Sequence, residues 1–446
     1  MTTTTGTRPA PPAPPSPPSP PSPSPSRPIA GHADGGTVTP LWSKIENPPV
    51  LWRPLASYYL LLASTALLVG FGVVMVWSSS YVESDQVSFA VVDKQLLWLS
   101  IGIPLMLIAS RLPVSVFRFL AYPALFASCG LLVAVLIPGL GVSANGATRW
   151  VAFGGPFTIQ PSEFAKLGLV LWGADLLARK HKLGTLDSYR RILVPLLPIS
   201  LFVLALIEKE HDLGTMLVVL TIVLSLLWVV GAPLRLFVVT MLAVVGGVTY
   251  LAISEPYRLQ RLLSFGHPFK DCLDTGWQAC QGIYGLGAGG WWGVGLGSSR
   301  QKWGYLPEAH TDFIFAIIGE ELGLVGTIAV LILFAVLAYS GIRVAQRSRD
   351  TFSRLAASAI VAWLLVQALV NVGAVIGLLP ITGIPLPLIS AGGSSLIPTM
   401  FALGMLMSLA RREPSAAAAI AARGPNVFRR GLHKTALVLH LSRRGR

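Results

Sequence analysis

Charged side chains are scarce in this sequence of 446 residues. Asp, Glu, Lys and Arg together make up 12%, about half of the ~25% that is usual in soluble domains. Only three cysteines are present, which excludes a disulfide-built scaffold and a four-cysteine zinc site. Hydrophobic residues make up 53%, and the mean hydropathy is +0.65. A soluble fold could not cover so much apolar surface with so few charges, so the composition predicts a polytopic membrane protein.

The net charge of +14 would suggest a nucleic-acid partner only if the basic residues shared one face. They are instead scattered between hydrophobic segments, as topology signals are. We therefore predict a membrane protein that does not bind nucleic acid.

Proline is concentrated at the N-terminus, where 12 of the 34 prolines lie between Pro9 and Pro28. Such a composition builds no hydrophobic core, so residues 1–47 are expected to form a disordered cytoplasmic tail. The tail is either a solvated spacer or a docking arm for a partner's aromatic groove. No short apolar stretch with a cleavage site precedes Trp42, so we expect no cleaved signal peptide. A basic cytoplasmic tail is expected over 413–446.

Hydrophobic runs of about 20 residues, the length that spans a bilayer, recur between these tails. They predict an all-α integral membrane protein with about ten transmembrane helices, within a domain over 48–412. The eighth run is too long for one straight span and is expected to extend beyond the bilayer. The runs cover residues 56–77, 95–110, 116–138, 161–179, 191–207, 213–230, 233–254, 312–342, 355–379 and 394–410.

Orientation follows from the basic residues, which are enriched on the cytoplasmic side of membrane proteins. With the N-terminus in the cytoplasm and ten spans, 25 of the 34 Lys and Arg residues fall inside, together with 5 of the 20 Asp and Glu residues. The opposite orientation would violate the rule at every loop. We therefore predict that both termini are cytoplasmic.

A long extracytoplasmic loop is predicted over 255–311, between helices 7 and 8. Its Gly- and Trp-rich part is expected to re-enter the membrane or to lie at its interface. Its glycine spacing imitates a phosphate-binding loop, but no βαβ context supports that interpretation. Cys272 and Cys280 lie in this loop, in an oxidising compartment, so we predict a disulfide between them. The alternative is two free thiols at an interface.

Ionisable residues in or beside membrane spans are costly and are therefore candidates for function. Glu163 and Lys166 are three residues apart, on one helix face, where they can pair. An ion pair that locks one helix to another is the structural alternative to a catalytic role. Asp212 begins a hydrophobic run and could cap that helix at its N-terminus.

The strongest local pattern is Glu308, His310 and Asp312 at the outer mouth of the eighth run. Asp312 is followed at once by Phe313-Ile314-Phe315, and partial desolvation would suit it to general-base chemistry. If the segment is helical, Glu308 shares a face with Asp312 and tunes it. The alternatives are a helix cap at Asp312 and, more weakly, a metal site.

Six motifs in order resemble the SEDS (shape, elongation, division and sporulation) family of glycosyltransferases, and most of all its cell-division members. Two positions depart from the family pattern: Ala391 replaces an aromatic residue, and Trp277 replaces a tyrosine. The resemblance covers about residues 55–412 and rests on 145–150 (NGATRW), 160–166 (QPSEFAK), 212–215 (DLGT), 295–302 (GLGSSRQK), 307–315 (PEAHTDFIF) and 385–395 (PLPLISAGGSS).

The resemblance implies that lipid II is polymerised into glycan strands at the outer face of the cytoplasmic membrane. Asp312 would be the general base, and undecaprenyl diphosphate would be the leaving group. Among the outer cations that could stabilise this anion, we favour Arg149 and Lys166 over Arg258, Arg300 and Lys302. The residues expected to bind substrate are Arg149, Trp150, Ser162, Glu163, Lys166, Asp212, Gln278, Arg300, Lys302, Glu308, His310, Ser394 and Ser395.

The family also implies partners: a class B penicillin-binding protein with transpeptidase activity, and other proteins of the division septum. No cofactor is certain. A divalent cation, Mg²⁺ or Mn²⁺, could share the charge of the diphosphate, although the sequence shows no dedicated cage for it.

Two alternatives to a division polymerase stay open. One is an elongation-type polymerase of the same family. The other is a flippase that moves lipid II across the bilayer, for which Glu320 and Glu321 are the best argument, because they would lie on a buried path. Helix packing through Gly319 and Gly323 is the structural explanation of these two acids.

Overall fold

The computed structural model describes most of the predicted membrane domain. The Pro-rich tail over 1–47 and the last part of the basic tail, 423–446, lie outside the described residues. The described residues are 53–80, 85–144, 147–152, 154, 158–184, 189–254, 269, 272 and 276–422.

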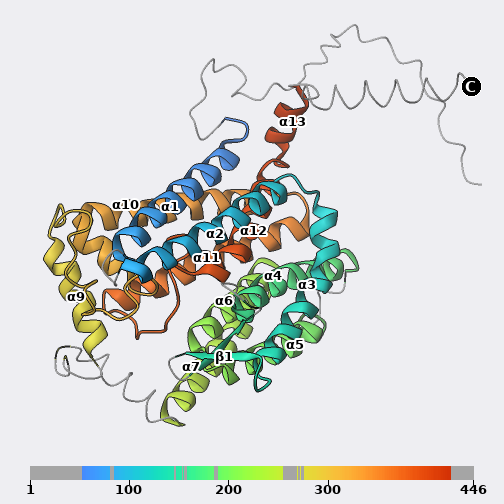
Figure 1. Ribbon diagram of the computed structural model, residues 1–446. Helices are drawn as coiled ribbons and strands as arrows, with labels where there is room; N and C mark the ends of the chain where they lie inside the picture. The colour runs from blue at the N-terminus through green and yellow to red at the C-terminus, as the bar shows by residue number, and fades with distance from the viewer. Residues whose placement is uncertain are drawn as a thin grey trace, which may run out of the picture. The chain divides into compact units, whose positions relative to one another are not determined.

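A helix stands at each of the ten predicted hydrophobic runs (Figure 1), so the all-α fold class is confirmed. The second helix begins ten residues earlier than its run. Two further helices, α9 (Trp277–Gly289) and α13 (Pro414–Ala422), lie in the predicted loop and tail. The ten are α1 (Ala56–Ser80), α2 (Asp85–Ala109), α3 (Val114–Val135), α4 (Pro161–Lys182), α5 (Tyr189–Lys209), α6 (Leu213–Val229), α7 (Leu234–Ser254), α10 (Ile314–Arg347), α11 (Thr351–Val375) and α12 (Gly393–Ala410).

Seven of the described helices are long and apolar enough to cross a membrane: α1, α2, α3, α5, α10, α11 and α12. Helix α4 differs because it carries Glu163, Lys166 and Asp175 within its first 18 residues. Helix α6 is 17 residues long, just short of a full span. The count of ten spans therefore stays a prediction.

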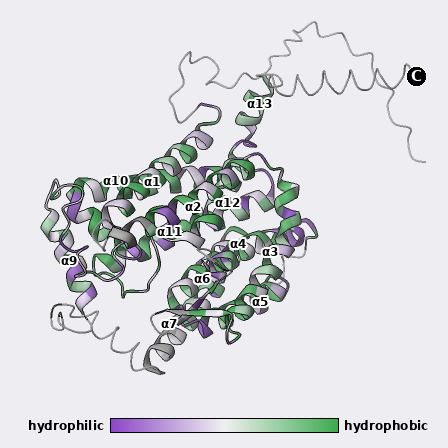
Figure 2. Cartoon of the chain, in the orientation of Figure 1, coloured by the Kyte–Doolittle hydropathy of each residue, from purple (hydrophilic) through white to green (hydrophobic). Residues whose placement is uncertain are grey.

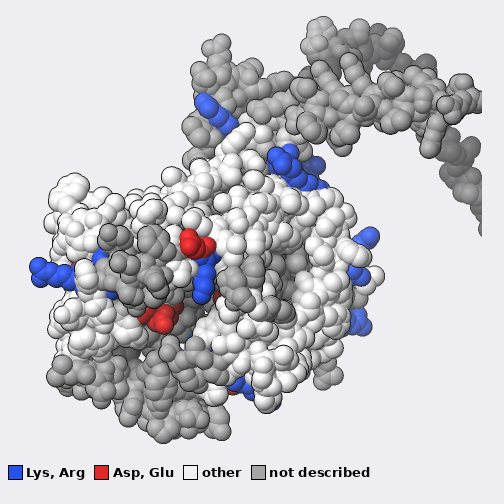
Figure 3. Space-filling model, in the orientation of Figure 1, with Lys and Arg blue, Asp and Glu red and all other residues white. Residues whose placement is uncertain are grey.

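Helices α11 and α12 form the centre of the bundle. The most apolar windows of α11 and α12 are 72% and 78% buried, against 28% for α2 and α3. The outer helices present apolar side chains such as Phe119 and Phe126 to their surroundings, and hydrophobic residues dominate these helices in Figure 2. Charged side chains are sparse on the face shown in Figure 3. This distribution is the one that a lipid environment requires.

A small antiparallel sheet, which the sequence analysis did not predict, connects α3 to α4. It consists of β1 (Gly141–Ala144), β2 (Ala147–Ala152) and β3 (Thr158–Ile159), in the order β1-β2-β3. Gly141 pairs with Val151, and a Cβ on Gly141 would lie 2.3 Å from the carbonyl oxygen of Val135. The sheet therefore folds tightly onto the end of α3.

Helix α10 is 34 residues long, and it is broken at Gly323, where φ is 66° and ψ is −162°. The Gly-rich segment after α9 satisfies the backbone groups that the break releases. The carbonyls of Glu320 and Glu321 accept from the N–H groups of Val294 and Gly295, both at 3.0 Å. On the other side of the break, the N–H groups of Leu324 and Val325 donate to Gly290 and Trp291. The predicted long span is thus two helical pieces joined at a backbone-paired break.

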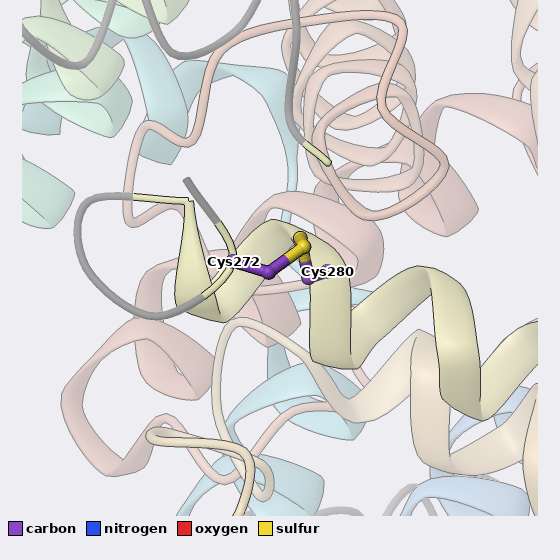
Figure 4. The surroundings of a disulfide bond; sticks show 2 residues. All are labelled: Cys272 and Cys280. Carbon is purple, nitrogen blue, oxygen red and sulfur yellow. A yellow bond between two sulfur atoms is a disulfide. The ribbon is translucent and has the colours of Figure 1, made fainter. Parts of the chain in front are cut away.

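The disulfide predicted between Cys272 and Cys280 is present, with the two Cα atoms 5.7 Å apart (Figure 4). Cys280 is buried in the first turns of α9. The indole of Trp277 donates to the carbonyl of Tyr305 at 2.6 Å. Helix α9 packs against α10 and α11, so this part of the predicted loop 255–311 is structured.

Candidate functional site

Asp312 lies in a series of turns that ends where α10 begins. Phe313 occupies the N-cap position of α10, so that position does not belong to Asp312. The shared helix face of Glu308 and Asp312 depended on a helical segment, and the residues before Phe313 form turns, so the two side chains do not share a face. Glu308 is exposed, and its carboxylate accepts a hydrogen bond from the hydroxyl of Thr311 at 2.7 Å. Asp312 and His310 are half-buried.

The backbone around Asp312 is held from the centre of the bundle. The Nδ2 group of Asn371, on α11, donates to the carbonyl of Asp312 at 2.7 Å and to that of Ile384 at 2.8 Å. The hydroxyl of Ser390 donates to the carbonyl of Thr311 at 2.7 Å. The last sequence motif therefore packs directly against the segment that carries Asp312.

Arg149, on β2, also lies close to Asp312. Its Nη2 donates to the carbonyl of His211 at 2.7 Å, and its Nε donates to that of Glu210 at 3.4 Å. A Cβ placed on Gly383 would lie 3.5 Å from Oδ2 of Asp312 and 3.7 Å from Nη1 of Arg149. Gly383 has a φ of 72°, which favours glycine. A carboxylate and a guanidinium thus converge beside one glycine backbone.

Asp212 is the N-cap of α6, as the sequence suggested. Its side chain accepts from the N–H of Thr215 at 3.0 Å and from the hydroxyl of Thr215 at 2.8 Å. The side-chain amide of Gln160 also donates to it, at 3.2 Å. The backbone N–H of Gln160 donates to the hydroxyl of Ser394 at 3.1 Å. These bonds tie together the first residues of α4, α6 and α12.

Glu210, in the turn between α5 and α6, was not among the predicted site residues. Its side chain is fully buried, and neither carboxylate oxygen has a hydrogen-bond partner in the part of the chain that the structure describes. Burial, and then the neighbouring carboxylate of Asp212, raise the pKa of Glu210 to about 8, against the effect of Arg149. The raised pKa favours the protonated, neutral form of Glu210. No spacing rule distinguishes it from Glu208 in sequence.

Glu163 and Lys166 form a fully buried ion pair, with Nζ 2.8 Å from Oε1. The same ammonium donates to Oε1 of Gln367, on α11, at 2.9 Å, and lies 5.2 Å from the ring centre of Trp363. The pair locks α4 to α11, which is the structural role that the sequence left open. Because the Lys166 side chain is fully buried, it is less accessible to an anionic substrate than the exposed cations are.

Gln367 and Asn371 are residues that the sequence analysis missed. They are polar, four residues apart in an apolar run, and therefore on one face of α11. That spacing could have identified them, because polar side chains within spans make hydrogen bonds or serve function.

Glu320 and Glu321 hold the segment that precedes the Asp312 loop. Glu320 accepts from the N–H of Arg300 at 2.9 Å and from the hydroxyl of Ser299. Lys302 lies 3.6 Å from Glu321, and both side chains are fully buried. Lys302 also donates to the carbonyls of Ser78 at 2.9 Å and of Gly297 at 2.8 Å. These contacts give Glu320 and Glu321 a structural role: they hold the segment over 299–302 against α10.

The other predicted substrate-binding residues occupy different environments. Arg300 is exposed, whereas Ser162 is fully buried and its hydroxyl has no hydrogen-bond partner among the described residues. Trp150 and Gln278 are half-buried, on β2 and on the first turn of α9. The hydroxyl of Ser395 donates to the carbonyl of Gly392 at 2.8 Å. The structure brings Arg149, Asp212, Ser394 and Asp312 into one cluster. Lys166 and Lys302 make their ion pairs elsewhere, with Glu163 and Glu321.

No group of three or more His, Cys, Asp or Glu residues that could hold a metal ion occurs among the described residues. A divalent cation stays a prediction from the family resemblance.

Fold and site together define a polytopic helical membrane protein with an Asp–Arg cluster at the ends of its central helices. The chain belongs to the FtsW/RodA/SpoVE family of cell cycle proteins, whose model matches residues 58–415. The resemblance to the SEDS family is thereby confirmed.

Individual relatives extend over most of the chain. A protein of Mycobacterium tuberculosis named "Probable peptidoglycan glycosyltransferase FtsW" is 44% identical over 375 residues, which cover 83% of this chain and 71% of the relative. Stage V sporulation protein E of Bacillus subtilis is 40% identical over 355 residues, which cover 79% and 96%.

Two solved structures share the fold of this chain. A chain from a structure described as "Structural coordination of polymerization and crosslinking by a peptidoglycan synthase complex" has a TM-score of 0.67 and 30% identity, covering 80% of this chain and 98% of that one. The rod shape determining protein RodA of Thermus thermophilus has a TM-score of 0.59 and 29% identity, covering 79% and 96%.

Proposed function

We propose that this protein is a peptidoglycan glycosyltransferase that polymerises lipid II during cell division. The observation that carries the proposal is the convergence of Asp312 and Arg149 beside Gly383. Relatives named as peptidoglycan glycosyltransferases, at 38–44% identity, support the reaction class. A base and a fixed cation are the two groups that the transfer of a glycosyl unit from a diphosphate requires.

In this mechanism the Asp312 carboxylate accepts the proton of the 4-hydroxyl on the acceptor's N-acetylglucosamine. The hydroxyl oxygen forms a bond to the anomeric carbon of the donor's N-acetylmuramyl unit. The bond from that carbon to undecaprenyl diphosphate breaks, and the electron pair leaves with the diphosphate. The guanidinium of Arg149 stabilises the developing negative charge, because it is fixed in place by two backbone carbonyls.

The setting of the reaction is part of the same proposal. The distribution of Lys and Arg supports a cytoplasmic-membrane protein with both termini inside and with Asp312 at the outer face. Similarity to a chain of a peptidoglycan synthase complex supports a partner, a class B penicillin-binding protein with transpeptidase activity. The similarity to FtsW proteins supports a place at the division septum, with other division proteins.

Polymerisation of purified lipid II, resolved on gels, tests the proposal. Asp312→Asn preserves the shape of the side chain and removes the base, so glycan synthesis should fall by about 10²–10⁴-fold. Glu308→Gln is the comparison, and it should be milder, because the exposed Glu308 carboxylate bonds within its own turn. Near-normal polymer from the Asp312→Asn protein would refute the assignment of the base. A wild type that moves lipid II across vesicles but never polymerises it would favour a flippase.

A further inference from the structure

A pocket of about 420 Å³ lies at the opposite end of the helices from Asp312. It opens where α3 and α11 begin and where α12 ends, whereas the Asp312 cluster involves the other ends of α11 and α12. The orientation predicted from Lys and Arg places this pocket at the cytoplasmic face. Its polar lining comprises Ser115, Arg118, Ser348, Arg349, Asp350, Ser353 and Arg412.

Three guanidinium groups from three separate elements line the pocket. Arg118, on α3, shares the buried Asp175 carboxylate with Arg179, each at 2.7 Å, so its charge is only partly compensated. Arg349, in the turn between α10 and α11, and Arg412, after α12, are exposed. The carboxylate of Asp350 accepts from both the N–H and the hydroxyl of Ser353 at 3.1 Å. The lining therefore has a surplus of positive charge.

Two helices begin at this pocket, and one of them has an N-terminus without a side-chain cap. Helix α3 starts after Pro113, which makes no side-chain cap bond, and its first two residues line the pocket. Helix α11 starts at Thr351, with Asp350 as its N-cap. The N-terminus of a helix carries about half a positive charge and presents N–H groups to anions. The N-terminus of α11 is already capped by the Asp350 carboxylate. The arginines and the uncapped N-terminus of α3 thus favour one ligand chemistry, a phosphate.

We propose that this pocket binds the phosphate of an anionic phospholipid from the cytoplasmic leaflet. Val114 and Leu409 line the same pocket, so its wall joins apolar side chains to the arginines, as a lipid headgroup site requires. The pocket lies at the ends of helices that are long and apolar enough to cross a bilayer, and headgroups lie at that level. Basic pockets between helices on the cytoplasmic side are a recognised form of lipid site.

The full-length protein in detergent, titrated with phosphatidylglycerol and observed by native mass spectrometry, tests the proposal. The double variant Arg349→Gln/Arg412→Gln should bind this lipid about 30-fold more weakly, since each arginine near a charged leaflet contributes a factor of about five. Arg354→Gln is the matched control: Arg354 is exposed in the first turn of α11 but does not line the pocket. It should bind as the wild type does.

A third variant should change affinity in the opposite direction. Asp350→Asn keeps an effective helix cap and removes the one carboxylate of the lining, so phosphatidylglycerol should bind about five-fold more tightly. Such a gain cannot come from misfolding.

Phosphatidylcholine and inorganic phosphate complete the design. The proposal expects weak binding of both, because phosphatidylcholine has no net charge and free phosphate lacks the apolar part. Equal retention of phosphatidylglycerol by the wild type and the double variant would overturn the proposal. Inorganic phosphate that displaces the lipid at equal concentration would overturn its assignment to a lipid.

Discussion

The Glu163–Lys166 pair allows a test that separates a structural role from a substrate-binding one. Both side chains are almost fully buried, and the ammonium makes one further bond, to Gln367. Replacing Lys166 by Met removes the positive charge and leaves the Glu163 carboxylate buried without compensation. Removing one partner of such a pair costs about 3–5 kcal/mol, so we expect Lys166→Met to lower the free energy of unfolding by that amount.

A double variant completes the cycle. In Glu163→Gln/Lys166→Met neither side chain is charged, so the penalty of an uncompensated ion disappears. We expect the double variant to be more stable than Lys166→Met alone, with a coupling free energy of at least about 1 kcal/mol between the two positions. Unfolding of the purified proteins in detergent, followed by heat or denaturant, gives the three differences from the wild type. Activity is measured below the lowest unfolding temperature of the set.

The opposite pattern would refute this reasoning. If Lys166 contacts the diphosphate of lipid II, Lys166→Met should fold with wild-type stability and show a raised KM. Neutralising Glu163 as well would then restore nothing. An unchanged stability of Lys166→Met is therefore the result that removes the structural role.

Three further predictions concern single positions. The pKa of Glu210 is raised to about 8, so the folded state binds more protons than the unfolded state between about pH 4.5 and 8, and stability falls as the pH rises through that window. Glu210→Gln should remove this loss of stability, which is on the order of a few kcal/mol at pH 9. Unfolding measured from pH 5 to 9 checks this. Gly323→Ala should destabilise the protein by at least about 1–3 kcal/mol, because its φ of 66° strains any residue with a Cβ and because that Cβ would lie 2.5 Å from the N of Gly293. Unchanged thermal unfolding would contradict the break in α10. Asn371→Ala leaves the carbonyls of Asp312 and Ile384 without the amide that donates to them. It should lower the free energy of unfolding by about 1–3 kcal/mol and lower the kcat of polymerisation. A variant with normal kcat would show that Asp312 is positioned without Asn371.

Hydrophobic runs were sufficient to predict the fold class and the positions of ten helices, because each backbone group in a bilayer must be satisfied within its own helix. The same rule explains what could not be predicted. The break in α10 depends on N–H and C=O groups from residues 290–295, about 30 residues earlier in the chain. Hydropathy does not record that pairing. The small sheet between α3 and α4 escaped prediction for a similar reason, since its strands are two to six residues long.

The candidate site was predictable in its residue types and only partly in its geometry. Asp312 and Arg149 were identified from motifs. Gly383 lies beside both side chains but was not identified, because the sequence around a loop glycine does not indicate which side chains lie next to it. Lys166 and Lys302 belong to motifs as specific as that of Arg149, yet both are buried in ion pairs. A cation in a membrane protein can serve the fold or the substrate, and a buried ion pair favours the first role. We therefore propose Arg149, which is half-buried and held by a backbone carbonyl, as the cation that acts with Asp312.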